Sequence, residues 1–295
     1  METIAIHERN IAISEFDLTT RVLEAGSGPV VLMLHGNPDN ADEWRELMAR
    51  LSGRYRCIAP DFPGYGKSNL PASFSYSLPD QVRFVDAVVR ATAVSGPVVV
   101  VVHDTGGMAG TAWASANLDR LRGMVITNTV VFDNFPWFPI ARMWGDTSLR
   151  GRIRASLGMF ALGLRKGALF QRVFGGQCPD LDQQQLDRFT TSFALNREAK
   201  RTALRQFRQM MRPGFFAEFE AMRGRILAKV PCRVLWGATD KFVPVQYAHG
   251  FGSKQVTILP EAGHWLALTD ADALAAEVDA IGKPQAVARP AVATS

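Results

Sequence analysis

The stretch Val98-Val-Val-Val-Val-His-Asp104-Thr-Gly-Gly-Met-Ala-Gly110 decides the fold of this 295-residue chain. Its run of valines predicts a buried central strand, because β-branched residues favour strands and continuous apolar runs are typical of parallel sheets. The small residues after Asp104 predict a sharp turn that leads directly into a helix. We therefore expect a strand, a turn and a helix in immediate succession, with an acidic side chain at the turn.

Asp104 stands at the position where a hydrolase with this local structure normally carries a serine. A strand, a sharp turn and a helix make up the nucleophile elbow, whose usual motif is G-x-S-x-G. A serine suits acyl transfer, whereas a carboxylate suits attack on a saturated carbon that carries a leaving group. The attack forms an alkyl ester of the enzyme, which water can cleave at the aspartyl carbonyl. The residue type therefore indicates carbon–halogen or epoxide opening rather than hydrolysis of esters or amides.

Strands and helices alternate along most of the chain. An extended segment is expected at 3–6, and apolar runs predict strands at 18–24, 30–34, 55–59, 98–102, 123–128, 232–236 and 256–259. Helical spacing of apolar residues is found at 42–51, 79–94 and 271–281, and a further helix is expected to end near 116. This alternation predicts an α/β fold with a doubly wound, mostly parallel eight-stranded sheet.

The alternation stops near Val131 and resumes at Cys232. The intervening segment is too long for a structureless loop, and its parts at 181–193 and 198–211 have helical spacing. We expect a helical cap inserted above the carboxyl ends of the strands, where open α/β folds bind ligands. The expected division is a core of residues 1–130 and 222–282, a cap of residues 131–221 and a disordered tail of residues 283–295.

Two more candidate catalytic residues follow predicted strands. Asp240 comes just after the seventh strand, and His264 comes just after the eighth. We expect Asp240 to hold the Nδ1–H of His264, which leaves Nε2 free to activate water, and histidine is suited to this because it titrates near neutral pH. Asp133, just beyond the sixth strand, is an alternative acid. The sequence thus supplies a nucleophile, an acid and a base in chain order.

The loop His35-Gly-Asn37-Pro38 follows the strand at 30–34 and is a candidate oxyanion-binding loop. A backbone N–H of this loop and the N–H of Thr105 could stabilise the oxyanion that forms when water attacks the Asp104 ester. The side-chain amide of Asn37 is also a donor suited to a departing halide. A structural turn role for Asn37 before proline is the alternative.

Composition excludes several other classes of function. The net charge of +5 is scattered, without a basic cluster, so a nucleic-acid partner is not expected. Cys57, Cys178 and Cys232 lack metal or C-x-x-C spacing and predict free thiols, and no metal or cofactor is expected. We find neither a leader pattern nor a membrane-spanning run, so we expect a cytoplasmic protein, monomeric or homodimeric, that acts on a small apolar substrate.

With these motifs the chain resembles the α/β-hydrolase superfamily, and within it the branch with an aspartyl nucleophile, the haloalkane dehalogenases and epoxide hydrolases. The resemblance covers residues 15–282 and rests on the segments 35–38, 61–68, 102–107 and 263–265, together with Trp44. It implies an α/β-hydrolase fold with Asp104 as nucleophile, His264 as base and Asp240 as acid. It also implies that Asn37 binds the halide.

The chain departs from these families at two places. Haloalkane dehalogenases of this type usually have a halide-binding tryptophan after the nucleophile, where this chain has Thr105, so we consider Trp137 or Trp144 of the cap as replacements. Epoxide hydrolases use cap tyrosines as acids, and all four tyrosines here lie outside the expected cap.

The resemblance favours hydrolytic dehalogenation of a small haloalkane through an alkyl-enzyme ester. An epoxide hydrolase is the runner-up. A haloacid dehalogenase is a further alternative, in which a cap arginine among Arg142, Arg150 and Arg152 would bind the carboxylate of the substrate. A hydrolase of unassigned substrate is another. A ligand receptor on this fold is disfavoured, because a binding module does not need a poised base.

Overall fold

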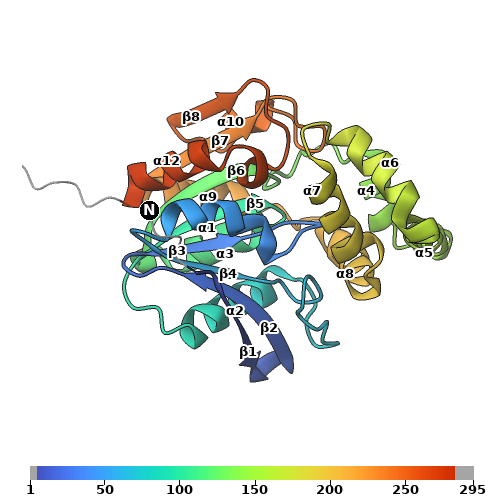
Figure 1. Ribbon diagram of the computed structural model, residues 1–295, viewed down its shortest axis with the longest axis horizontal. Helices are drawn as coiled ribbons and strands as arrows, with labels where there is room; N and C mark the ends of the chain where they lie inside the picture. Colours follow the sequence, from blue (N-terminus) through green and yellow to red (C-terminus); the bar gives the residue numbers. More distant parts are fainter. Residues whose placement is uncertain (1–4, 283–295) are drawn as a thin grey trace, which may run out of the picture.

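In the computed structural model, which describes residues 5–282, β5 (Val98–Asp104) lies inside an eight-stranded sheet of order β1-β2-β4-β3-β5-β6-β7-β8 (Figure 1). Strands β3 to β8 are parallel, and β2 pairs antiparallel with both β1 and β4. The predicted eight-stranded, mostly parallel sheet is therefore confirmed. The other strands are β1 (His7–Ile13), β2 (Leu18–Ala25), β3 (Val30–Leu34), β4 (Arg56–Pro60), β6 (Leu121–Thr129), β7 (Cys232–Gly237) and β8 (Gln255–Leu259).

Helices cover both faces of this sheet. The valines of β5 alternate between the faces: Val98, Val100 and Val102 join one apolar cluster, whereas Val99 and Val101 join the other. The first cluster includes side chains of α2 (Leu78–Ala91), α3 (Gly106–Ala116) and α9 (Phe219–Lys229). The second includes side chains of α1 (Arg45–Leu51), α11 (Leu266–Thr269) and α12 (Ala271–Gly282). Both faces of the run of valines are thus buried, as expected for a central parallel strand.

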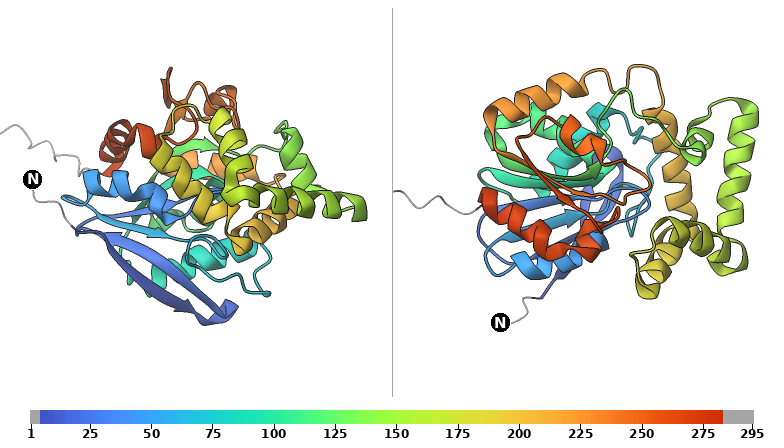
Figure 2. Two further views of the ribbon diagram at one scale, coloured as in Figure 1. Left: turned by 45° about the vertical axis from the view of Figure 1, so that its right-hand side comes forward. Right: turned by 90° about the horizontal axis from the view of Figure 1, so that it is seen from above.

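All regular secondary structure in the segment between β6 and β7 is helical. It contains α4 (Pro139–Gly145), α5 (Leu149–Leu162), α6 (Ala168–Gln177), α7 (Gln183–Phe189), the π-helix η5 (Thr190–Ala194) and α8 (Arg197–Met210). These helices lie together at one side of the sheet, whereas α9 returns to pack along α3 (Figures 1 and 2). The expected division at residue 222 falls inside α9.

Some expected boundaries differ in the structure. Of the segment 3–6, residues 3 and 4 lie outside the described residues and residues 5 and 6 are not in a strand; β1 begins at His7, where its pairing with Glu24 of β2 begins. The helix expected from residue 42 begins as the 3-10 turn η2 (Ala41–Trp44) before α1. The expected disordered tail 283–295 lies outside the described residues. In the part that is described, no helix is long and apolar enough to cross a membrane.

Candidate active site

The elbow at Asp104 depends on an unusual backbone conformation. Asp104 is the last residue of β5 and has φ of +45°, a region that non-glycine residues rarely adopt. Gly36 lies so close that a Cβ there would overlap the Asp104 side chain. Thr129 Oγ1 at the end of β6 donates to the Asp104 carbonyl oxygen at 2.6 Å. The turn thus pushes the carboxylate out beyond the sheet edge, and its neighbours hold it there.

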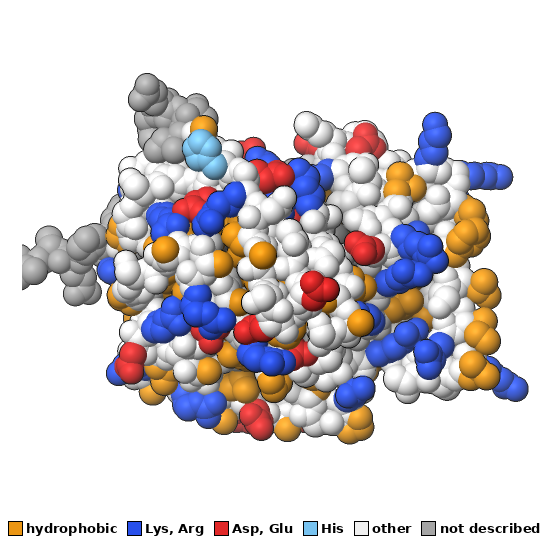
Figure 3. Space-filling model, turned by 90° about the horizontal axis from the view of Figure 1, so that it is seen from below, with side chains coloured by type: hydrophobic (Ala, Val, Ile, Leu, Met, Phe, Trp, Pro, Cys, Tyr) orange, Lys and Arg blue, Asp and Glu red, His pale blue; other side chains and the backbone are white. Residues whose placement is uncertain are grey.

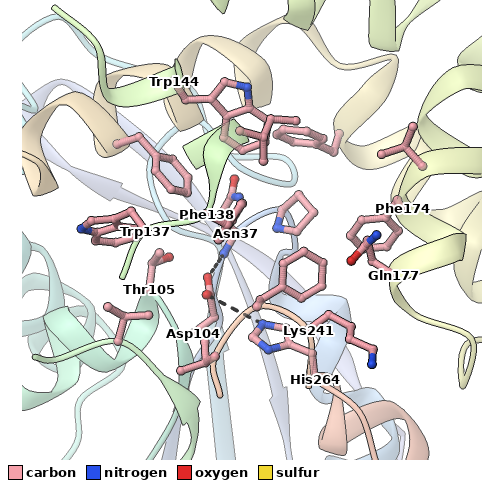
Figure 4. A pocket seen from close by; sticks show the side chains of 18 of the residues that line it. Asn37, Asp104, Thr105, Trp137, Phe138, Trp144, Phe174, Gln177, Lys241 and His264 are labelled. Carbon is pink, nitrogen blue, oxygen red and sulfur yellow. Dashed lines mark hydrogen bonds and ion pairs between the residues drawn. The ribbon is translucent and has the colours of Figure 1, made fainter. Parts of the chain in front are cut away.

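The Asp104 carboxylate makes two contacts that suit a nucleophile (Figure 4). The backbone N–H of Asn37 donates to Oδ1 at 2.8 Å, and His264 Nε2 lies 3.7 Å from Oδ2. The first contact comes from the loop after β3, as expected for an oxyanion-binding loop. The second leaves His264 close to the carboxylate without a direct hydrogen bond, so its Nε2 is available to a water that approaches Asp104.

Asp240 orients His264 from the opposite side. Its Oδ2 lies 2.7 Å from His264 Nδ1, and its Oδ1 accepts from the backbone N–H groups of Phe242 and Val243 at 2.7 and 3.0 Å. Burial alone would raise the pKa of Asp240, but the His264 imidazole, the side-chain amide of Asn128 and the Val243 N–H hold it below its usual range. Asp240 is therefore a buried carboxylate, whereas Asp133 is exposed beyond β6.

Asn128 is a site residue that the sequence analysis missed. It lies at the end of β6 with φ of +33°, and its Nδ2 donates to Asp240 Oδ2 at 2.6 Å. Its Oδ1 accepts the backbone N–H of Gly237 at 3.2 Å. Asn128 therefore holds Asp240 from a third strand, and a polar amide at the end of an apolar strand was the only sign of this in the sequence.

A second buried charge pair lies beside His264. The rings of His103 and His264 are 4.4 Å apart, and His103 Nδ1 is 2.7 Å from Oε1 of the fully buried Glu43, without the alignment of a directional hydrogen bond. Burial alone would lower the pKa of His103, but the Glu43 carboxylate outweighs this effect and raises the pKa to about 9. Neither His103 nor Glu43 was among the candidate site residues of the sequence.

The side-chain amide of Asn37 belongs to a chain of polar groups that reaches the cap. Tyr65 Oη lies 3.1 Å from Asn37 Oδ1 and 2.7 Å from Gln206 Oε1 of α8. One hydroxyl proton can serve only one acceptor, so Gln206 donates its own N–H when Tyr65 donates to Asn37. In that arrangement the Asn37 oxygen is occupied and its NH₂ is free for a ligand. None of these contacts was visible in the sequence spacing.

A cavity of about 380 Å³ opens above Asp104 between the core and the cap. Asn37, Asp104, Thr105 and His264 line its floor, and the cap contributes mainly aromatic and aliphatic walls. Trp137 and Trp144 both line it, but their indole nitrogens point away from Asp104 (Figure 4). Its lining includes none of Arg142, Arg150 and Arg152: Arg142 donates to the Trp137 carbonyl, and the other two are exposed on α5.

A family model described as "Alpha/beta hydrolase family" matches residues 31–277. The chain belongs to the alpha/beta hydrolase family. This assignment agrees with the sheet order, the elbow after β5 and the chain order of Asp104, Asp240 and His264.

Relatives of this alpha/beta hydrolase carry different enzyme names. It is 40% identical over 120 residues to the cis-3-alkyl-4-alkyloxetan-2-one decarboxylase of Xanthomonas campestris pv. campestris, a match that covers 38% of this chain and 40% of that protein. It is 38% identical over 119 residues to the haloalkane dehalogenase of Agrobacterium fabrum, covering 40% of this chain and 38% of that protein. The matches thus span about two fifths of these curated relatives.

Solved structures support the same fold. The solved structure of the epoxide hydrolase CorEH without ligand has a TM-score of 0.76 to this alpha/beta hydrolase over 94% of this chain and 98% of its own, at 17% identity. At that identity the likeness supports the fold alone.

Among the described residues, no group of three or more His, Cys, Asp or Glu side chains could hold a metal ion.

Proposed function

We propose that this alpha/beta hydrolase opens a bond between a saturated carbon and a leaving group in two steps, with Asp104 as the nucleophile. The observation that carries the proposal is a carboxylate at the elbow, 3.7 Å from the base His264. In the first step an Asp104 oxygen bonds to the carbon, and the leaving group departs with the bonding electrons. The product of this step is an alkyl ester of Asp104.

Water completes the reaction in the second step. His264 Nε2 takes a proton from a water that attacks the Asp104 carbonyl carbon, and Asp240 stabilises the imidazolium that forms. The Asn37 N–H, 2.8 Å from Oδ1, stabilises the oxyanion, with the Thr105 N–H as the expected second donor. Collapse releases the alcohol and restores the carboxylate. For a halide X the sum is R–X plus water to R–OH, X⁻ and one proton.

A small haloalkane is the substrate that we assign first. The cavity of about 380 Å³ is walled mainly by apolar side chains, which suits a small apolar molecule without charged groups. The Asn37 amide, held through Tyr65, is the donor for the departing halide. The dehalogenase relative from Agrobacterium fabrum is consistent with this assignment.

A strained oxygen ring is the second candidate, and the orientation of the tryptophans favours it. Thr105 cannot supply an indole N–H, and those of Trp137 and Trp144 point away from Asp104, so halide stabilisation rests on few donors. An oxetan-2-one opens to a carboxylate, which is a far weaker base than the alkoxide from an epoxide and does not require a tyrosine acid. The decarboxylase relative is named for such a ring.

The test is halide release from a panel of short bromoalkanes by the wild type, Asp104→Ala and the matched control Asp133→Ala, which removes an exposed carboxylate. We expect release by the wild type and the control and none by Asp104→Ala. Release that survives in Asp104→Ala would refute the nucleophile. No release by the folded wild type would refute the halide assignment, and turnover of epoxides or oxetan-2-ones would then identify the second candidate.

A single turnover in ¹⁸O-labelled water tests the ester itself. The alcohol must take its oxygen from Asp104, so the first product is unlabelled and the label enters the carboxylate of the enzyme. His264→Gln should accumulate the ester, detected as added mass on the peptide that contains Asp104. Labelled alcohol in the first turnover would instead mean that water attacks the substrate directly.

A further inference from the structure

Helix α5 is apolar on two opposite faces, although only one of them is covered. The inner face carries Gly151, Ala155, Met159 and Leu162, all buried. The outer face, two residues out of phase, carries Leu149, Ile153, Leu157 and Phe160, and Leu157 and Phe160 are 63% and 66% exposed. A helix of a soluble domain normally presents polar residues on its outer face. The outer stripe thus requires an explanation beyond folding.

The stripe continues through η4 (Leu164–Gly167) onto α6. Leu164, Leu169 and Val173 are exposed, whereas Phe170 and Phe174 on the inner side of α6 line the cavity. Val173 is 46% exposed and also lines the cavity. The exposed stripe therefore reaches the rim of the substrate cavity.

Cations surround this stripe, and anions are missing from it. Residues 147–179 contain no Asp or Glu and include six exposed cationic side chains: Arg150, Arg152, Arg154, Arg165, Lys166 and Arg172. By helical spacing, Arg150 and Arg154 flank the stripe on one side and Arg152 flanks it on the other. The cap end of the molecule in Figure 3 accordingly shows orange and blue side chains without red ones.

We propose that this outer cap face, the exposed apolar stripe of α5, η4 and α6 with its six cations, docks on an anionic lipid surface. Leucine and phenylalanine side chains would enter the boundary of the acyl chains, while the long arginine stems reach back to the lipid phosphates. Charge complementarity selects this occupant, because each cation is attracted to an anionic leaflet. A second copy would instead bring like charges against each other.

Docking would place the rim of the cavity at the lipid boundary. Val173 joins the stripe to the cavity, so an apolar substrate dissolved in the membrane could enter without crossing water. This inference concerns where the protein binds, and it does not depend on which substrate Asp104 attacks. Asp104→Ala should therefore bind vesicles as the wild type does.

Vesicle flotation tests the proposal. We expect the wild type to float with phosphatidylcholine vesicles that contain phosphatidylglycerol, to bind pure phosphatidylcholine weakly and to dissociate as salt rises. Leu157→Ser with Phe160→Ser, and Arg150→Gln with Arg154→Gln, should each weaken binding about tenfold or more. The control Arg9→Gln with Lys254→Gln removes the same amount of charge from the surface outside the cap and should leave vesicle binding unchanged.

A fluorescent label tests the orientation. The three native cysteines are buried, so a polarity-sensitive dye can be attached selectively to Leu157→Cys or, as the control, to Lys254→Cys. Anionic vesicles should shift the emission of the first label to the blue and leave the second unchanged.

Three results would overturn the proposal. The first is a wild type that does not bind anionic vesicles, and the second is equal binding by all variants. The third is a dimer in solution that Leu157→Ser with Phe160→Ser converts to a monomer, because a second copy would then cover the face.

Discussion

Asp104 combines a strained backbone with a carboxylate that few groups touch. Its φ of +45° is costly for a non-glycine residue, and the elbow persists because β5 and α3 fix the chain on both sides. This conformation makes the Asp104 carboxylate accessible from the cavity while most of the residue is buried. At the scale of single residues, the site is therefore defined as much by the neighbours that hold Asp104, Asn37 and His264 as by these residues themselves.

Tyr65→Phe should impair the proposed leaving-group site without disturbing the fold. It removes only the hydroxyl that holds the Asn37 amide, 3.1 Å away, so the amide can rotate. We expect slower formation of the Asp104 ester in single-turnover kinetics, by about tenfold, as for loss of one positioned hydrogen bond of 1–1.5 kcal/mol. Tyr55→Phe, which changes a buried tyrosine far from the cavity lining, is the matched control. Equal rates for the two variants would contradict a positioning role.

The ion pair of His103 and Glu43 predicts how stability depends on pH. The pKa of His103 is raised to about 9 in the folded protein, above the value of about 6.5 for an unfolded chain. Its contribution to stability is therefore complete below about pH 6.5 and is lost as pH rises through about 9. In Glu43→Gln the strongest cause of the raised pKa is gone, and burial is opposed only by the charges of Asp104 and Asp240, so the pKa of His103 falls and the loss of stability toward pH 9 should shrink.

The measurement is the melting temperature of both proteins between about pH 6 and 9.5, the window set by these values. We expect the wild type to lose several degrees across this range, whereas Glu43→Gln should lose clearly less. Parallel curves would show that Glu43 does not hold a proton on His103.

At the scale of elements, three loops converge on the site because parallel strands end at the same edge of the sheet. The loops after β3, β7 and β8 carry Asn37, Asp240 and His264, and β6 adds Asn128 at its end. The cap is tied to the first of these loops. Arg188 of α7 makes a bidentate contact with Asp39 at 2.8 and 2.9 Å, and Asp39 is almost fully buried.

Arg188→Met should destabilise the protein because it leaves the Asp39 carboxylate buried without its cation. Breaking a buried pair in this way costs about 3–5 kcal/mol, and loss of order in the loop that holds Asn37 should lower activity as well. Urea unfolding measures the change in free energy. Arg201→Met, which removes an exposed cap arginine, should have almost no effect.

The double variant Arg188→Met with Asp39→Asn separates charge from packing. Removal of the uncompensated carboxylate should recover a large part of the lost stability. A double variant no more stable than Arg188→Met alone would assign the loss to packing of the arginine stem instead.

At the scale of the whole molecule, the cap and the core share one apolar cluster. It extends from the sheet through α2 and α3 to the aromatic residues of the cap, and Phe189 of α7 lies 5.0 Å from Trp265 of the core, measured between ring centroids. Continuous packing of this kind predicts that the cap does not unfold by itself. The cavity is then a gap inside a single cooperative unit.

Phe189→Ala tests this cooperativity. The deletion of a fully buried aromatic ring should lower the free energy of unfolding by about 3–5 kcal/mol, for the cap and the core together. Hydrogen exchange should show amides of β5 and α8 losing protection in step. Phe84→Ala, on the core helix α2, serves as the reference. Loss of protection in α4 to α8 alone would mean that the cap is a separate folding unit.

The sequence by itself determined the local elements and the chain order of the site. Valine runs, helical spacing and polar residues just past strand ends are short-range signals, so β3 to β8, the elbow and the positions of Asp104, Asp240 and His264 could be predicted. Asn128, Tyr65, Gln206 and Glu43 could not, because each acts through a partner distant in sequence. Only the tertiary structure decided these contacts, the direction of the indoles of Trp137 and Trp144, and which face of α5 stays uncovered. The physical reason is that periodicity reports which side of an element is apolar, whereas packing of several elements decides what each side meets.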